Sequence, residues 1–254
     1  MMRKNSMQVP CVVSVCMATY NGEKYIREQI DSILPQLSDS DELVISDDGS
    51  SDSTIDIIQG YNDRRIRLYH NTRHGVTWNF ENALRQSRGD VIFLADQDDV
   101  WKPGKVERMK EWLKSSILVI HNADVVDKNG NLINEDYFSL AGVRNGFWRN
   151  LVKFRHIGCC MAFRRQLLLE CMPFPRGVVC HDYWICMYAL AKYGAMMEHE
   201  SFLLYRRHGN NTSSASEASD TSFFFKLFEK RLPILFCVGL RIIRNMVKKL
   251  SYTL

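Results

Sequence analysis

Residues 93–101 read Phe93-Leu94-Ala95-Asp96-Gln97-Asp98-Asp99-Val100-Trp101, so three carboxylates follow directly on a short apolar run. The run predicts a buried strand that delivers the acidic side chains to the C-terminal edge of an open α/β sheet, where such sheets bind ligands. Carboxylates this close repel one another, so a cation or strong hydrogen-bond donors should offset their charge. Because Mg²⁺ is usually held by one or two carboxylates and by substrate phosphates, the spacing suggests a metal site for a phosphorylated substrate. The alternative is an acidic turn that caps the next helix.

Strands and helices alternate through the first half of the chain. Short apolar runs predict strands, and apolar residues at helical spacing predict the helices between them. This alternation predicts an α/β fold whose mainly parallel central sheet is covered by helices on both faces. The predicted strands are residues 12–18, 43–45, 66–69, 91–95 and 117–120, and the predicted helices are residues 25–37, 53–58, 77–87 and 106–113.

The second half of the chain is less regular. Residues 127–130 predict a turn, residues 157–163 a Cys-rich strand, residues 182–192 a helix and residues 202–205 another strand. Residues 210–222 are polar and rich in Ser and Thr, which is typical of a mobile segment.

The length and composition indicate one large domain with a basic appendage. A chain of 254 residues can bury a sizeable core. Its net charge of +4 is uneven, because residues 223–254 carry +6 and residues 1–222 carry −2. The eight cysteines form no C-x-x-C pair and several lie in apolar runs, so we expect reduced, buried thiols in a cytosolic protein rather than a zinc site.

The N-terminus predicts a core strand rather than a signal peptide. Arg3 and Lys4 precede an apolar run, but residues 12–18 are too few for most signal-peptide apolar regions and include a serine. No stretch approaches the roughly 20 apolar residues that span a bilayer.

Two further polar motifs follow predicted strands. Ala18-Thr19-Tyr20-Asn21-Gly22 leaves room for a ligand or forms an ordinary turn, and the absence of G-x-G-x-x-G gives no indication of a dinucleotide site. The second motif is Ser46-Asp47-Asp48-Gly49-Ser50-Ser51-Asp52, in which one Asp can accept from a ring N–H of a base while the other fixes the loop. Helix capping is the alternative, but the adjacent pair Asp47-Asp48 exceeds what a cap needs.

Two later motifs carry candidate catalytic and ligand-binding groups. His181-Asp182 opens a predicted helix, whose N-terminus stabilises the anionic form that a general base needs; a plain cap is the alternative. The other motif is Tyr205-Arg206-Arg207-His208-Gly209-Asn210-Asn211 at a strand end. Its histidine can bind a metal and its arginines can pair with phosphate oxygens, or it forms a solvated basic loop.

In this order and spacing, these motifs resemble the family 2 glycosyltransferases of the GT-A fold over most of residues 10–210. Asp-Gln-Asp-Asp-Val-Trp followed by His-Asp-Tyr-Trp and Tyr-Arg-Arg-His most resembles the rhamnosyltransferase-like branch, which builds bacterial surface polysaccharides such as O-antigen. The resemblance implies a catalytic domain over residues 1–222, with a donor-binding half at about 10–125 and an acceptor-side half at about 126–222. It also implies a Rossmann-like, mainly parallel sheet and a nucleotide-diphosphate sugar donor.

The resemblance also implies a role for individual residues. Asp48 would read the base, with help from residues 18–20 and Asp47, and Asp96 would contact the ribose or the metal shell. Asp98 would ligate Mg²⁺ or Mn²⁺, and His208 would complete that shell. Asp182 would be the catalytic base. The remaining expected contacts are Asn79 and Arg206 at the donor and Gly158, Cys159 and Trp184 on the acceptor side.

Two departures from the family pattern bear on mechanism. The family often has Glu-Asp where this chain has His181-Asp182, which makes His181 a rival base or a supporting residue, since its ordinary pKa is near 6.5. The Gln-x-x-Arg-Trp motif of processive synthases is absent, which favours addition of a single sugar. The expected reaction is a single displacement with inversion at the anomeric carbon. Its acceptor is a glycan hydroxyl, on a lipid-linked molecule.

Residues 223–254 predict an amphipathic helical segment in two pieces divided by Pro233. Its aromatic residues and seven cations favour an interfacial segment on anionic lipid, at the inner face of the cell membrane, over an arm packed on the domain.

Other functions of the protein remain open: a sugar-phosphate nucleotidyltransferase, a glycoside hydrolase, or a module that binds nucleotide-sugar or membrane without turnover. A nucleic-acid partner is not expected. The sequence does not separate UDP from dTDP donors.

Overall fold

Four parallel strands form the N-terminal part of the central sheet in the computed structural model, which describes residues 11–178, 180–208 and 231–251. Their order across the sheet is β3 (Ile66–His70), β2 (Glu42–Asp47), β1 (Val13–Thr19) and β4 (Val91–Asp96). Every side chain of β1 and β2 is buried, which explains the nearly continuous apolar runs in their sequences.

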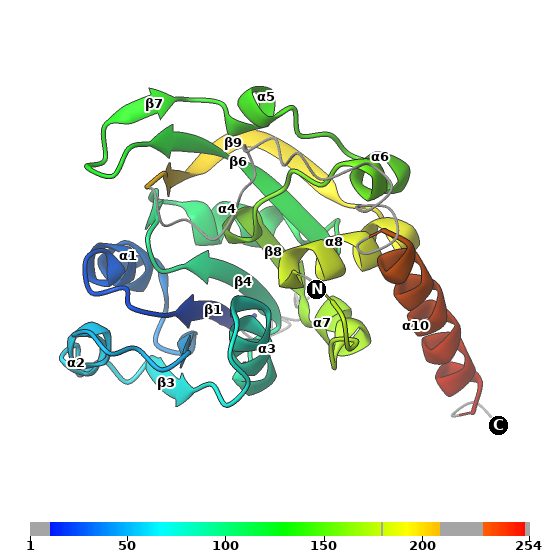
Figure 1. Ribbon diagram of the computed structural model, residues 1–254, viewed down its shortest axis with the longest axis horizontal. Coiled ribbons are helices and arrows are strands. Elements are labelled where there is room, and N and C mark those ends of the chain that lie inside the picture. Colours follow the sequence, from blue (N-terminus) through cyan, green and yellow to red (C-terminus); the bar gives the residue numbers. More distant parts are fainter. Residues whose placement is uncertain (1–10, 179, 209–230, 252–254) are drawn as a thin grey trace, which may run out of the picture.

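Helices cover these strands on both faces (Figure 1). The chain runs outward from β1 to β3 and then returns to β4, so right-handed crossovers place α1 (Ile26–Ile33) and α2 (Thr54–Gln59) opposite α3 (Val76–Gln86). α3 packs against β1 and β2, and α1 contacts α2. The short helix η1 (Leu34–Gln36) follows α1, and α4 (Lys105–Trp112) packs beside η1. The predicted strand–helix alternation is therefore confirmed.

The second half of the chain extends the same sheet. β8 (Met161–Arg164) lies antiparallel between β4 and β6 (Leu118–Val126), which pairs in parallel with β9 (Met196–Arg206). β5 (Val100–Trp101) and β7 (Leu132–Asn134) add antiparallel pairs to β9 and β6. The prediction of a mainly parallel sheet is correct, but the strand predicted at residues 202–205 is too short, because β9 begins at Met196.

Helices accompany the strands of the second half. They are α5 (Tyr137–Ala141), α6 (Phe147–Val152), α7 (Arg165–Cys171) and α8 (His181–Lys192). The predicted helix at residues 182–192 is confirmed as α8, whereas α5 and α6 are too short for helical periodicity to reveal them. The predicted strand at residues 157–163 is partly wrong, because the 3₁₀ turn η2 (Gly158–Cys160) precedes β8.

α10 (Leu232–Ser251) is one continuous helix that packs against α7 and α8 and projects from the side of the molecule (Figure 1). Pro233 lies in the first turn of α10, where a missing N–H removes no intrahelical hydrogen bond. The helical piece predicted before Pro233 falls outside the described residues, so the division of the tail at Pro233 stays a prediction. The rest of the predicted tail, residues 223–230, and the polar segment 210–222 lie outside the described residues.

Arg241 fixes α10 to the end of α7. Its guanidinium donates hydrogen bonds to the carbonyl oxygens of Cys171 at 2.7 Å, Met172 at 2.9 Å and Pro173 at 2.6 Å. A cation is favourable at a helix C-terminus, where the last carbonyls have no intrahelical partners. The sequence analysis counted Arg241 among cations for the membrane surface, but the structure buries it in this contact.

Replacing Arg241 by Met should therefore destabilise the fold. The variant keeps most of the side-chain volume but leaves several carbonyls without a donor, at a cost of about 2–3 kcal/mol in the free energy of unfolding. Urea denaturation measures this loss. Arg244→Met, on the exposed side of the same helix, is the matched control and should change stability by less than about 0.5 kcal/mol. Equal stabilities of the two variants would contradict the role given to Arg241.

Candidate active site

The C-terminal ends of three parallel strands meet at one edge of the sheet, as the sequence predicts. Thr19 lies opposite Asp47 across β1 and β2, and Ala18 lies opposite Asp96 across β1 and β4. A cavity of about 920 Å³ opens at this edge. The predicted site residues in its lining are Ala18, Thr19, Tyr20, Asp48, Asn79, Asp96, Asp98, Gly158, His181, Asp182 and His208. The lining residues outside the predicted set are Asn21, Gly22, Lys24, Tyr25, Gly75, Val76, Gln97, Lys128, His156, Ile157, Cys180 and Tyr205.

Asp48 and Asn79 present polar atoms at one end of the cavity. Asp48 accepts hydrogen bonds from the Gly75 N–H at 2.8 Å and from Asn71 Nδ2 at 2.7 Å, which fix its carboxylate in the cavity wall. Asn79 donates through Nδ2 to the Thr19 carbonyl oxygen at 3.0 Å, but its buried Oδ1 has no partner among the described residues. An unsatisfied buried acceptor is costly, so this end of the cavity suits a ligand with N–H groups.

Asp47, the neighbour of Asp48, supports the loop instead of lining the cavity. Its buried carboxylate accepts from the backbone N–H groups of Gly49 at 2.9 Å and Ser50 at 2.8 Å and from Thr19 Oγ1 at 3.0 Å. These contacts hold the turn after β2 against the end of β1. Asp47 is thus the acid of this pair that fixes the loop, and it is not placed in the lining of the cavity as a donor contact.

Gln97 joins the acidic loop to the loop after β1. Its Oε1 accepts from the Tyr20 N–H at 3.0 Å and its Nε2 donates to the Tyr20 carbonyl oxygen at 3.0 Å. Gly22 leaves the space for this side chain, because a Cβ at Gly22 would lie 2.2 Å from Gln97 Oε1. The sequence analysis gave Gln97 no role, and its place between two acids was the only signal.

Asp98 and His208 bring two predicted metal ligands together. His208 Nε2 lies 2.7 Å from Asp98 Oδ2, and the imidazole stacks on Tyr25 with 5.2 Å between ring centroids. Burial, followed by the negative charges of Asp98 and Asp182, raises the pKa of Asp96 to about 7. These carboxylates and the imidazole offer oxygen and nitrogen donors of the kind that hold Mn²⁺, and the carboxylates alone suit Mg²⁺.

Asp99 lies behind this group and does not line the cavity. It is 1 % exposed, its Oδ1 accepts from the Arg206 N–H at 3.0 Å, and its Oδ2 has no partner among the described residues. Burial, then the charge of Asp98, raises its pKa well above the ordinary value. Behind it, the fully buried Lys105 donates from Nζ to the Cys159 carbonyl oxygen at 2.8 Å, and burial lowers its pKa to about 8. The acidic loop is therefore backed by a buried amine that the sequence did not reveal.

Arg206 supports the acidic loop through hydrogen bonds. The sequence instead predicts that Arg206 contacts the donor. Its Nε donates to the Asp98 carbonyl oxygen at 2.9 Å, and another guanidinium nitrogen lies 2.6 Å from Glu28 Oε2. The guanidinium is buried and does not line the cavity. Lys24 and Lys128 are the lysines that line it, so they replace Arg206 as the candidate cations for a phosphate group.

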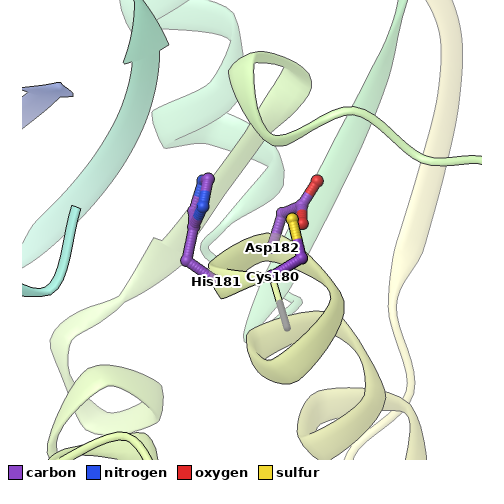
Figure 2. A group of neighbouring side chains, drawn as sticks. All are labelled: Cys180, His181 and Asp182. Carbon is purple, nitrogen blue, oxygen red and sulfur yellow. The ribbon is translucent and has the colours of Figure 1, made fainter. Parts of the chain in front are cut away.

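Gly158, His181 and Asp182 form the other end of the cavity, where η2 meets the first turn of α8. Figure 2 shows His181 and Asp182 side by side at the start of the helix. His181 is 5 % exposed and stacks on Phe80 with 3.7 Å between ring centroids, while neither ring nitrogen has a partner among the described residues. Burial lowers the pKa of His181 to about 4, so its ring is neutral at pH 7 and a weaker proton acceptor than an ordinary histidine.

Cys159 and Trp184 were predicted on the acceptor side, but neither lines the cavity. Both are fully buried, and Trp184 Nε1 donates to the Cys171 carbonyl oxygen at 3.1 Å. Trp184 follows Asp182 by two positions on α8, so the two side chains leave the helix in different directions. Gly158 is thus the one member of these three that faces the cavity.

Gly158→Ala should reduce activity more than stability. A Cβ at this position would lie 3.1 Å from His181 Nε2 and 3.6 Å from Asp182 Oδ2, so it would fill the space between them. A displacement of about 1 Å near the reacting groups can cost about 100-fold in rate, and we expect a loss of this order. Gly239→Ala, where an added Cβ meets nothing within 4 Å, is the control. Turnover and thermal unfolding are measured for both; unchanged turnover of Gly158→Ala would contradict this role.

The sequence is similar to those of bacterial glycosyltransferases, of which three are described. An uncharacterised glycosyltransferase of Nostoc sp. is 28% identical over 224 residues, which are 82% of this chain and 68% of that protein. The dTDP-rhamnosyl transferase RfbG of Shigella flexneri is 26% identical over 246 residues, 86% of this chain and 78% of that protein. The Escherichia coli UDP-Glc:alpha-D-GlcNAc-diphosphoundecaprenol beta-1,3-glucosyltransferase WfgD is 29% identical over 166 residues, 65% of this chain and 64% of that protein.

Solved glycosyltransferase structures share the fold. TarS residues 1–349 of S. aureus superpose with a TM-score of 0.62 at 21% identity, over 76% of this chain and 60% of that chain. In its complex with UDP-GlcNAc the TM-score is 0.64 at 18% identity, over 91% and 66% of the two chains. The mannosyltransferase PcManGT of Pyrobaculum calidifontis, in complex with GDP-Man and Mn²⁺, gives 0.61 at 21% identity, over 81% and 59%. This chain therefore spans about three fifths of the first TarS chain, and its predicted GT-A fold is confirmed.

The sequence model of glycosyl transferase family 2 matches residues 14–171. This range covers β1 to α7 and includes the motifs at the ends of β1, β2 and β4. The chain belongs to glycosyl transferase family 2.

Proposed function

We propose that the protein is an inverting glycosyltransferase that moves one sugar from a nucleotide-diphosphate sugar to a hydroxyl group of a glycan acceptor. The observation that carries the proposal is that a single cavity is lined by Asp48, by the Asp98–His208 pair and by Asp182. These groups suit, in turn, a nucleobase, a metal-bound diphosphate and an acceptor hydroxyl. The activity of a nucleotidyltransferase or of a hydrolase would not explain all three of these groups.

The donor would lie along the edge of the sheet. Either Asp48 or the unpaired Oδ1 of Asn79 would accept the N3–H of uracil or thymine, the one N–H group that these bases keep in a nucleotide. Lys24 and Lys128 line the cavity and attract the diphosphate. A dTDP-rhamnose or UDP-hexose donor would suit this arrangement, and RfbG and WfgD are named for donors of these two kinds.

Asp98 and His208, together with Asp96, would hold Mg²⁺ or Mn²⁺. Their donor atoms fit such an ion, because Asp98 Oδ2 and His208 Nε2 lie 2.7 Å apart. Burial and the charges of Asp98 and Asp182 raise the pKa of Asp96, and a bound cation would offset this repulsion. When bound, the ion would neutralise the charge that grows on the departing diphosphate. The likeness to PcManGT, solved with Mn²⁺, agrees with this assignment.

Asp182 would act as the general base. As the acceptor oxygen attacks C1 of the sugar from the face opposite the diphosphate, Asp182 takes the hydroxyl proton. The bond from C1 to the acceptor oxygen forms while the bond from C1 to the diphosphate oxygen breaks, so the configuration at C1 inverts. The cavity that Gly158, His181 and Asp182 line would admit the acceptor hydroxyl.

The acceptor would be a lipid-linked glycan in the assembly of O-antigen, capsule or another surface polysaccharide. Support comes from the relatives, because WfgD is named for a diphosphoundecaprenol-linked substrate and RfbG for rhamnosyl transfer. Release of nucleoside diphosphate tests the function: the protein is incubated with dTDP-rhamnose or UDP-glucose, with and without Mn²⁺ and a bacterial glycolipid extract. We expect release with one donor that requires both additions, and an inverted linkage in the product. No release from either donor under any condition would contradict the proposal.

α10 would place the enzyme on the membrane surface that holds such an acceptor. One face of α10 packs on α7 and α8 through Ile234, Val238 and Arg241. The other face exposes a stripe at helical spacing: Leu232, Phe236, Leu240, Ile243, Met246 and Val247. Arg244 and Lys248 are exposed on the same helix and favour anionic lipid. Among the helices described, none is long and apolar enough to cross a bilayer. The proposed contact is with the surface of the inner face of the cell membrane.

Substitution of Leu240 and Ile243 by Ser should weaken binding to anionic vesicles. Removing two buried aliphatic side chains from a lipid contact should cost roughly tenfold to 100-fold in affinity. Leu132 and Ile133 on β7, which are 54 % and 57 % exposed compared with 51 % and 60 % for the α10 pair, give a matched double-serine control. Flotation with phosphatidylglycerol vesicles measures binding. If the two double variants float equally well, the stripe on α10 does not contact membrane.

A further inference from the structure

Cys180, His181 and Asp182 place a sulfur, a nitrogen and an oxygen donor together at the start of α8. The donor atoms lie within 4.8 Å of one another, and Figure 2 shows the three side chains projecting to the same side of the helix. All three residues line the cavity. His181 adds an independent sign of a ligand, because this buried side chain has two ring nitrogens with no hydrogen-bond partner among the described residues.

We propose that Cys180, His181 and Asp182 form a binding site for a thiophilic divalent cation, Zn²⁺, distinct from the Asp98–His208 pair. Thiolate, imidazole and carboxylate are the ligands that Zn²⁺ takes in proteins, and three of them leave a fourth tetrahedral position open toward the cavity. Mg²⁺ and Mn²⁺ prefer oxygen ligands and compete poorly for a site that contains a thiolate. On binding, the Cys180 Sγ–H bond breaks, the proton passes to solvent, and the sulfur electron pair binds the metal.

The geometry needs only small side-chain rotations. Bonds of about 2.0–2.3 Å to Zn²⁺ bring tetrahedral ligand atoms to within about 4 Å of one another. Burial and the charge of Asp182 raise the pKa of the Cys180 thiol, so the cation itself must displace the thiol proton when it binds. Gly158 packs directly against this pair, since a Cβ there would lie 3.1 Å from His181 Nε2, so the ion would approach from the cavity that all three ligands line.

A second cluster, formed by Asp96, Asp99 and Cys159, meets the same distance limit but is a poorer candidate. Cys159 and Asp99 are fully buried and do not line the cavity, so an ion has no open route to them from that side. Access therefore favours Cys180, His181 and Asp182.

Occupation of this site has a consequence that rests on the proposed function. Asp182 cannot ligate Zn²⁺ and also accept the acceptor's proton, so Zn²⁺ should inhibit transfer while the donor end of the cavity stays available. The site would then couple sugar transfer to the free concentration of a soft metal.

Titration of the full chain with Co²⁺ in excess Mg²⁺ tests metal binding without any enzymatic readout. Co²⁺ replaces Zn²⁺ and shows a charge-transfer absorption band only when a thiolate ligates it. The band should appear in the wild-type protein, disappear on addition of Zn²⁺, and be absent in Cys180→Ser. Because loss of even an outer-shell partner weakens metal binding roughly 10- to 100-fold, loss of the thiolate should weaken Zn²⁺ binding by at least about 100-fold. Cys237→Ser, which changes another half-buried cysteine, should keep the band.

Two results would overturn the site: no thiolate band in the wild-type protein, or a band that persists in Cys180→Ser. A band that persists there and disappears in Cys159→Ser would assign the metal to the second cluster. Inhibition is measured separately, as the Zn²⁺ dependence of nucleoside diphosphate release relative to each variant's own zinc-free rate. A protein that binds Co²⁺ through Cys180 but releases no nucleoside diphosphate would leave the metal site standing and refute the proposed function.

Discussion

Asp182→Asn is expected to abolish sugar transfer while donor binding persists. The carboxamide keeps the size of the side chain but cannot take the acceptor's proton. General base catalysis contributes about 10²- to 10⁴-fold, so the turnover rate should fall by about 10³-fold. Stabilisation of the variant by UDP or dTDP with Mn²⁺ should remain, because Asp48 and the Asp98–His208 pair are intact. Rates of nucleoside diphosphate release and thermal unfolding curves measure the two effects.

His181 is the rival base, and its variant discriminates between the two assignments. Because burial lowers the pKa of His181 to about 4, its neutral ring binds a proton weakly, so His181→Gln should cost less than Asp182→Asn. Asp56→Asn changes an exposed acid in the first turn of α2 and should leave the rate unchanged. If His181→Gln inactivates the enzyme and Asp182→Asn does not, the base is His181.

Asp98→Ala is expected to remove the effect of the divalent metal on both binding and turnover. At about 100 times Kd, nucleotide with Mn²⁺ should stabilise the wild-type protein by about 2.7 kcal/mol, and this stabilisation should be lost in the variant. Turnover should fall by about 10²- to 10³-fold, the usual cost of losing a group that stabilises charge in the transition state. Thermal unfolding with UDP and with dTDP, each with and without Mn²⁺, measures the first effect and also separates the two donor bases.

Asp39→Ala is the matched control for Asp98→Ala, because Asp39 is an exposed acid paired only on the surface with Arg64. It should keep the full metal-dependent shift. If the metal-dependent shift in thermal stability persists in Asp98→Ala, the metal is not held by the Asp98–His208 pair. Loss of the shift in both variants would indicate damage to the fold and would count against a local role for Asp98.

The sequence by itself determined the sheet and the edge at which the site forms. Two apolar runs are long enough to form strands, and they lead into Asp47-Asp48 and into Asp96-Gln97-Asp98. Parallel strands joined by helices must bring the ends of these runs to one edge of the sheet. The position of Asp182 at the start of a helix was also readable, because His181-Asp182 precedes a long apolar helix. These features depend on contacts that are local in the chain.

Only the tertiary structure decided which polar side chains face the cavity. Asp47 and Asp48 are neighbours, yet one closes a loop and the other lines the site, because the turn after β2 directs their side chains differently. Arg206 contacts Glu28 and the Asp98 carbonyl oxygen, groups 178 and 108 residues away in the chain, and these contacts hold it beside the acidic loop. Lys24 and Lys128 line the cavity instead. Contacts between residues so far apart in the chain leave no periodic signal in the sequence. Arg241 likewise binds the end of α7, which is distant in the chain, and this contact determines which face of α10 stays exposed.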